Sequence, residues 1–127
     1  MTKAADFEKA HRLAMKCDFL LFDALYHHNF RMESFGIEMN REDDKAVYAS
    51  VSELTVYGPV KVPFENNQFL CHTVLMRENL EDDIFEFSKI MVVSTFEDRQ
   101  VLHQESVFEK LDFDPNEGQD WNWEDYQ

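Results

Sequence analysis

Carboxylates are the most abundant side chains in this sequence that could take part in chemistry. The chain has 26 Asp and Glu residues against 12 Lys and Arg residues, which gives a formal net charge of −14 over 127 residues. Paired carboxylates can act as general acid and base or can bind Mg²⁺. With this many acids close pairs arise by chance, so their number alone identifies no catalytic pair.

Histidine, cysteine and serine fall into no catalytic or metal-binding pattern. The five histidines lack His-x-x-x-His spacing, and no Cys-x-x-Cys motif is present. Cys71 and His72 are adjacent, so on a strand they would point to opposite faces. His27 and His28 would lie near the end of the first helix, where an imidazolium suits the helix dipole. The sequence has no Gly-x-Ser-x-Gly motif and no phosphate-binding loop. We therefore expect no cofactor, no bound metal and no catalytic residue, and a protein that is not an enzyme.

A long amphipathic helix is predicted to support the rest of the domain, from Ala4 to Asn29. Apolar residues recur there at three- and four-residue steps, and no Gly or Pro interrupts them. The stripe consists of Phe7, Ala10, Ala14, Cys17, Leu21 and Leu25.

The next segments favour strands. A short strand, Ser34–Met39, is expected to lead into a polar turn at residues 40–44. Residues 46–57 are rich in β-branched and aromatic side chains, which favours a strand, although Asp44 could instead cap a helix that ends at Gly58.

Further strands are predicted in the second half of the chain. Val60–Val62 precedes a proline and is typical of an edge strand, and Phe69–Met76 has strand composition. In Ile84–Phe96 apolar and polar residues first alternate and then give way to a continuous apolar run, which is the best strand pattern in the chain. Val101–Leu111 fits a helix face better than a strand face, so a helix capped by Asp98 is predicted there.

These elements predict one α+β domain over residues 1–111, with an N-terminal amphipathic helix packed on an antiparallel sheet of about four strands and a short C-terminal helix. Residues 112–127 form an acidic aromatic tail with six acids and no base. Trp121 and Trp123 are its candidate anchors for a partner protein.

The negative charge is concentrated after the first predicted helix. Residues 1–31 carry a net charge of +1, so the remainder carries −15. Carboxylates three or four residues apart on a helix lie roughly 5–6 Å apart, a spacing that can approximate a row of phosphates. The candidate protein-binding acids lie mainly in the predicted turns: Glu42, Asp43, Asp44, Glu78, Glu81, Asp82, Asp83, Glu86, Glu97 and Asp98.

In charge, size and low cysteine content the chain resembles the DNA-mimic anti-restriction and anti-CRISPR proteins of phages and mobile elements, and the bacterial immunity proteins that block nucleases. The resemblance implies a non-enzymatic inhibitor that occupies the nucleic-acid-binding surface of a basic protein. One alternative is an interaction or assembly module that docks through its tail, and another is a metal-dependent hydrolase.

The location expected from the sequence is a cytoplasmic one. The N-terminus lacks the pattern of a signal peptide, and the longest apolar run is far shorter than the roughly 20 residues of a membrane span. Cys17 and Cys71 could form at most one disulfide, which favours a reducing compartment. Neither direct nucleic-acid binding nor membrane binding is expected, and a homo-oligomer is compatible with the sequence.

Overall fold

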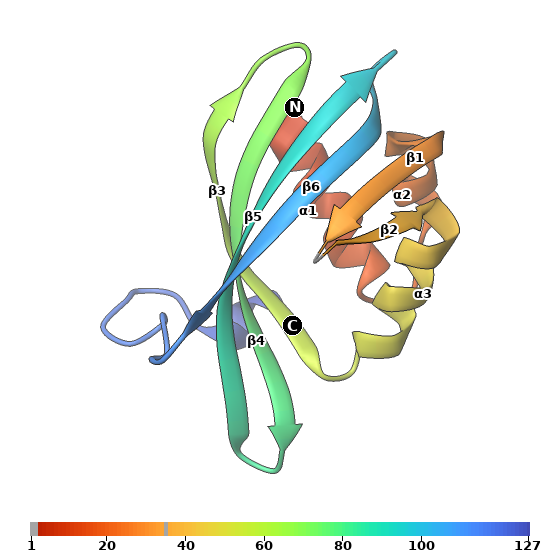
Figure 1. Cartoon of the computed structure of the whole chain (residues 1–127). Helices are drawn as coiled ribbons and strands as arrows, with labels where there is room; N and C mark the ends of the chain where they lie inside the picture. Colours follow the sequence, from red (N-terminus) through yellow and green to blue (C-terminus); the bar gives the residue numbers. More distant parts are fainter. Residues whose placement is uncertain (1–2, 35) are drawn as a thin grey trace.

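The computed structural model describes residues 3–34 and 36–127. In these residues the chain forms three α-helices and one six-stranded sheet. The helices lie on one side of the sheet (Figure 1). The helices are α1 (Lys3–Ala14), α2 (Leu20–Leu25) and α3 (Arg41–Val51), and a short 3-10 helix, η1 (Trp123–Tyr126), lies near the C-terminus. The strands are β1 (Tyr26–Ser34), β2 (Ile37–Asn40), β3 (Thr55–Glu65), β4 (Phe69–Glu81), β5 (Ile84–Glu97) and β6 (Gln100–Leu111).

The α+β class is confirmed, but the sheet differs from the prediction. It has six strands in the order β2-β1-β6-β5-β4-β3, and not about four. It is mixed, because β1 and β6 run parallel while the other neighbours are antiparallel. Among the described helices, none is long and apolar enough to cross a membrane.

The predicted single helix over residues 4–29 is two helices and the start of a strand. The first ends at Ala14, and Cys17 adopts a left-handed backbone conformation with φ of 61° that stops its continuation. The second helix ends at Leu25, and Tyr26 begins β1 by pairing with Val101 of β6. The apolar stripe continued across the break because both helices pack on the same core.

The predictions of a turn at residues 40–44 and a strand at 46–57 were wrong over most of their length. Asn40 caps α3: its side chain accepts a hydrogen bond from the Asp43 backbone N–H, and the Asp43 carboxylate accepts one from the Asn40 N–H. This reciprocal capping box starts a helix despite the β-branched residues that follow. Only the part of the predicted strand from Thr55 onward is strand.

The predicted strands at 60–62, 69–76 and 84–96 are confirmed as parts of β3, β4 and β5, and β3 is an edge strand. The helix predicted at 101–111 is wrong, since these residues pair along β5 from Val101 to Leu111. The strand pattern was hidden because two of its inward-facing residues, Gln104 and Ser106, are polar. Asp98 lies in the β5–β6 turn with φ of 51° and caps no helix.

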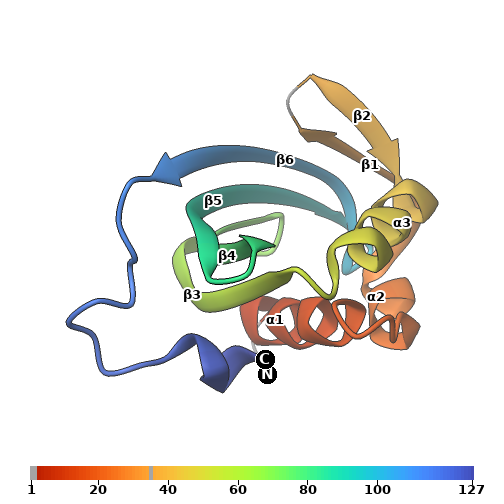
Figure 2. The same ribbon diagram turned by 90° about the horizontal axis from the view of Figure 1, so that it is seen from below.

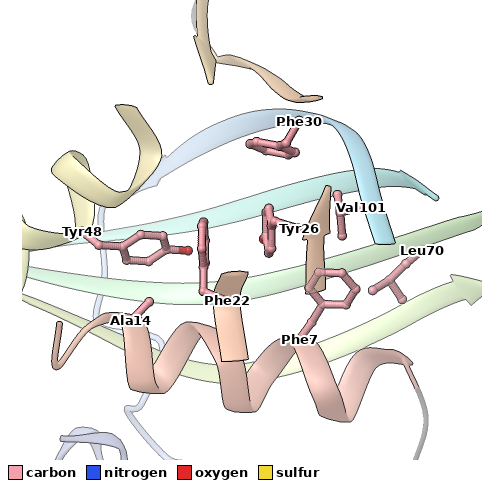
Figure 3. Close-up of a cluster of buried hydrophobic side chains, with 8 residues drawn as sticks. All are labelled: Phe7, Ala14, Phe22, Tyr26, Phe30, Tyr48, Leu70 and Val101. Carbon is pink, nitrogen blue, oxygen red and sulfur yellow. The ribbon is translucent and has the colours of Figure 1, made fainter. Parts of the chain in front are cut away.

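The sheet curves around α1 and α3 (Figure 2). In β3 the pairing with β4 slips between Tyr57 and Val60, so two residues of β3, Gly58 and Pro59, lie opposite one residue of β4, Leu75. This bulge bends the strand and turns both Tyr57 and Val60 toward the hollow side. Two buried clusters form there, and Figure 3 shows the larger one, in which Phe22 stacks on Tyr26 with ring centroids 4.1 Å apart.

The predicted tail packs back onto the domain. Trp123 is 3% exposed and lies against Gly58, where an added Cβ would come within 2.9 Å of its ring. Its indole Nε1–H donates to the Asp114 carboxylate at 3.1 Å. Glycine at position 58 therefore lets the C-terminal segment sit directly on the bulge of β3.

Replacing Asn40 by Ala removes the side chain that caps α3. We expect the free energy of unfolding to fall by ~1 kcal/mol, as for other N-cap deletions. Urea denaturation followed by circular dichroism measures this loss, with Asn67→Ala in the exposed β3–β4 loop as the matched control. Equal stabilities of the two variants would contradict the role of the capping box.

Candidate active site

A cavity of about 600 Å³ lies between the hollow face of the sheet, α1 and α3. Most of its wall is apolar, because alternate residues of β4 and β5 point inward and β1 and β2 add two methionines. Apolar side chains in this wall include Met15, Met32, Met39, Val60, Val74, Ile90 and Val92. A concave, mostly apolar cavity with a few polar groups is the usual form of a small-molecule site.

A chain of hydrogen bonds fixes one side of the cavity. Gln104 Nε2 donates to the Ser94 hydroxyl at 2.9 Å and to the Tyr26 hydroxyl at 3.1 Å. The Tyr26 oxygen lies 2.6 Å from Nε2 of His11. Tyr26 can donate its proton to His11 when the imidazole carries its own proton on Nδ1, and can accept from His11 when that proton is on Nε2. The network thus fixes the position of His11 beside Tyr26.

Two imidazoles meet in the cavity wall although they are far apart in the sequence. The rings of His11 on α1 and His72 on β4 have centroids 6.1 Å apart. Burial, with smaller contributions from His72 and Arg12, lowers the pKa of His11 to about 3. Burial likewise lowers the pKa of His72 to about 4. Both rings are therefore uncharged at neutral pH.

Asp44 places a carboxyl group in the same cavity. It lies in the first turn of α3 and is 6% exposed. Burial raises the pKa of this carboxyl to about 7. The group can therefore exchange a proton near neutral pH, as a general acid or base must.

Tyrosine side chains surround this carboxyl. Its negative charge contributes to raising the pKa values of Tyr26, Tyr48 and Tyr57, after the larger effect of their burial. Tyr48 lies one helical turn after Asp44, and its ring centroid is 5.8 Å from that of His11. These phenols stay protonated over the physiological range, so each remains a hydrogen-bond donor.

Arg12 closes the cavity beside the C-terminal segment. Its guanidinium donates to the carbonyl oxygens of Tyr57 and Gly58 and pairs with Glu8 at 2.7 Å. The Tyr126 ring packs against it at 4.5 Å from the ring centroid. The charge of Arg12 is thus engaged with the framework and with Glu8.

The acids predicted to form one binding surface fall into separate groups, of which the largest lies at the β4–β5 hairpin. Asp82 and Asp83 form the β4–β5 turn, while Glu97 and Asp98 lie at the opposite end of β5. Asp44 is inside the cavity. Glu78, Glu81 and Glu86 lie in the same hairpin as Asp82 and Asp83, since Glu81 ends β4 and Glu78 pairs with Glu86 across β4 and β5. The remaining predicted residues lie elsewhere: Asp43 caps α3, Glu42 lies near Lys45, and Trp121 packs on Trp123.

His11, His72 and Gln104 were missed as site residues by the sequence analysis. Each could have been noticed as a polar residue at a position where the helix or strand periodicity predicts an apolar one. His11 lies four residues after Phe7 and three before Ala14 on the buried stripe of α1, and His72 alternates with Leu70 and Val74 on β4. Among the described residues, no three His, Cys, Asp or Glu side chains gather as a metal site would require.

Comparison with known proteins identifies the fold. No family model matches the sequence, and no curated protein is significantly similar to it. Among solved structures, a provisionally assigned isomerase from Rhodopseudomonas palustris is 7% identical with a TM-score of 0.72 over 86% of this chain and 90% of its own. IdmH, a provisionally assigned polyketide cyclase from Streptomyces antibioticus, is 7% identical with a TM-score of 0.67 over 86% and 93%. An NTF2-like protein of unknown function from Cytophaga hutchinsonii is 11% identical with a TM-score of 0.64 over 86% and 91%. The chain therefore has an NTF2-like fold.

The prediction of a DNA-mimic inhibitor with anti-restriction or anti-CRISPR activity was wrong. The prediction that the protein is not an enzyme was also wrong. Structures with this fold include proteins named as an isomerase, a cyclase and a hydroxylase. The error arose because net charge was interpreted as the functional feature, whereas the acids are spread over separate turns and one of them is buried in a cavity.

The raised pKa of Asp44 predicts a pH-dependent effect of Asp44→Asn on stability. Between about pH 4 and pH 7 the native protein keeps the Asp44 proton that the unfolded chain has lost, so this group reduces stability as the pH rises. The amide that replaces the carboxyl does not titrate, so the variant does not lose stability in this way as the pH rises. Relative to wild type, its free energy of unfolding should therefore rise by ~2–4 kcal/mol from pH 4 to pH 8.

Urea denaturation of both proteins across this range measures the difference. His11 and His72 titrate in both proteins, so their contributions cancel. A difference that stays constant with pH would show that Asp44 is not held protonated.

Proposed function

We propose that this protein is an enzyme that encloses a small, largely apolar molecule and moves protons on it by general acid–base catalysis. Asp44 is the group that takes and returns the proton. The observation that carries the proposal is a buried carboxyl in an apolar cavity with a pKa of about 7, beside uncharged histidine and tyrosine side chains.

The reaction class that fits these groups is removal of a proton from carbon next to a carbonyl. The Asp44 carboxylate takes the proton, and the electron pair of the broken C–H bond forms the C=C bond of an enolate while the carbonyl electrons move to oxygen. The Asp44 carboxylic acid then returns the proton to carbon, at the same or another position. No oxidant or other reactant is needed, because each proton that leaves is given back.

The neutral side chains around Asp44 can stabilise the charge that develops on the carbonyl oxygen. A donor that is uncharged in the resting site and aimed at a forming oxyanion stabilises the transition state more than the ground state. His11 in its Nδ1–H tautomer and the protonated Tyr57 are the donors of this kind that we assign in the cavity wall.

The neighbours in structure support this class of reaction. Two of them are named as an isomerase and a polyketide cyclase. Isomerisation and carbon–carbon ring closure can both begin with a proton lost next to a carbonyl. The enclosed cavity supports it too, because exclusion of water protects an enolate from premature protonation.

Exchange of carbon-bound protons tests the proposal. The protein is incubated in D₂O with 2-tetralone, an enolisable bicyclic ketone, and loss of the α-methylene signal is followed by ¹H NMR. We expect exchange above the buffer rate, and a decrease of ~10²-fold or more in Asp44→Asn, the usual loss when a general base is removed. Asp82→Asn, an equivalent change in the exposed β4–β5 turn, should exchange at the wild-type rate.

Equal exchange by wild type and Asp44→Asn would refute Asp44 as the proton acceptor. Circular dichroism and the unfolding midpoint of each variant show that any lost exchange does not come from misfolding.

A further inference from the structure

We propose that the cavity is selective for an uncharged ligand whose carbonyl or hydroxyl oxygen is hydrogen-bonded by His72, and that it rejects carboxylates and ammonium ions. The inference rests on the proposed function, since it names the substrate class of the same site. It makes His72 a ligand-binding residue, a role separate from proton transfer at Asp44.

Among the described residues, the cavity has no buried cation that is free to pair with an anionic ligand. Of its two cationic lining residues, Arg12 is engaged by Glu8 and by two backbone carbonyls, and Lys16 is exposed to solvent. The exposed carboxylates of Glu53 and Asp125 also lie in the lining and would repel an anion as it enters. A carboxylate that reached the interior would meet Asp44.

The interior does not favour a positive charge either. His11 and His72 both lose their protons there, although a carboxyl group lies in the same wall. A site that keeps two imidazoles uncharged and also keeps Asp44 partly protonated disfavours buried charge of either sign. A neutral ligand is the one that enters without adding such a charge.

His72 has hydrogen-bonding capacity that the protein leaves unused. The side chain lines the cavity and is 4% exposed, and its Nδ1 atom is buried without a hydrogen-bond partner in the described part of the chain. Leaving a buried polar atom unpaired is unfavourable. His11, by contrast, is already engaged with Tyr26. An oxygen on the ligand would satisfy the imidazole of His72.

The rest of the wall suits an apolar body. Val74 follows His72 on the inner side of β4, and Ile90 and Val92 lie beside it on β5. Met15 just after α1, Met32 on β1 and Met39 on β2 can adapt to irregular shapes. A molecule with one oxygen on a bicyclic hydrocarbon frame therefore matches the chemistry of the cavity.

Four naphthalenes of similar shape test the proposal. They are 2-acetylnaphthalene, its hydrocarbon analogue 2-isopropenylnaphthalene, 2-naphthoate and 2-naphthylmethylammonium. Their binding to the full chain is measured by titration calorimetry at pH 6, where Asp44 is mostly protonated, and for 2-naphthoate also at pH 8. The ketone should bind about five-fold more tightly than the hydrocarbon, the value of one net hydrogen bond. It should bind at least about 30-fold more tightly than either ion.

Variants locate the oxygen contact. In His72→Phe the ketone and the hydrocarbon should bind equally, whereas His72→Gln, which keeps a donor and an acceptor, should preserve part of the ratio. The matched control is His103→Phe on β6, which lies outside the cavity lining and should keep the full five-fold ratio. In Asp44→Asn the ketone should still bind, while the rejection of 2-naphthoate should weaken.

The proposal is overturned if either ion binds as tightly as the ketone, if the ketone-to-hydrocarbon ratio survives in His72→Phe, or if none of the four compounds binds. These outcomes separate it from the proposed catalysis. If ketone binding depends on His72 but 2-tetralone does not exchange, the proposed ligand class is supported and the proposed enzymatic activity is refuted. If 2-tetralone exchanges but 2-naphthoate binds more tightly than the ketone, the enzymatic activity is supported and the ligand class is refuted.

Discussion

A carboxyl group inside an apolar cavity must either give up its charge or be stabilised by neighbouring dipoles. Asp44 lies in the first turn of α3, where the helix dipole favours its charge, yet burial prevails and raises its pKa to about 7. Burial of this group costs stability, and the same burial lets the carboxyl exchange its proton near neutral pH. The side chains that share its cavity include the neutral imidazoles of His11 and His72 and the phenols of Tyr48 and Tyr57, and the charge of Arg12 is paired with Glu8.

The architecture that encloses this carboxyl depends on the curvature of the sheet. The bulge in β3 turns Tyr57 and Val60 toward the same side, and the 12 residues of α1 cover only part of the hollow. The space that α1 and α3 leave unfilled is the cavity. Core packing and site geometry therefore share residues: Phe7 and Tyr48 belong to the buried cluster in Figure 3 and also line the cavity.

The local patterns of the sequence were sufficient for the α+β class and for the strands with clear alternation, such as β5. They failed where one local interaction outweighed propensity, as in the Asn40–Asp43 capping box, and where inward strand positions are polar, as at Gln104. Local patterns could not predict the site, because His11 and His72 are 61 positions apart in the sequence and come together only through the packing of α1 on β4. Net charge directed attention to exposed acids, whereas the informative acid was the buried one.

The edges of the sheet bear on how this molecule avoids polymerising. An unpaired edge strand can template pairing with another chain, and the two edges here are β2 and β3. The first has only four residues, while the second contains Pro59 and Pro63 and two breaks in its register. Proline offers no N–H to an incoming strand, and the breaks prevent a long regular ladder. The same distortion of β3 that shapes a chemical pocket thereby also protects the folded chain from edge-to-edge aggregation, and a net charge of −14 adds long-range repulsion between copies.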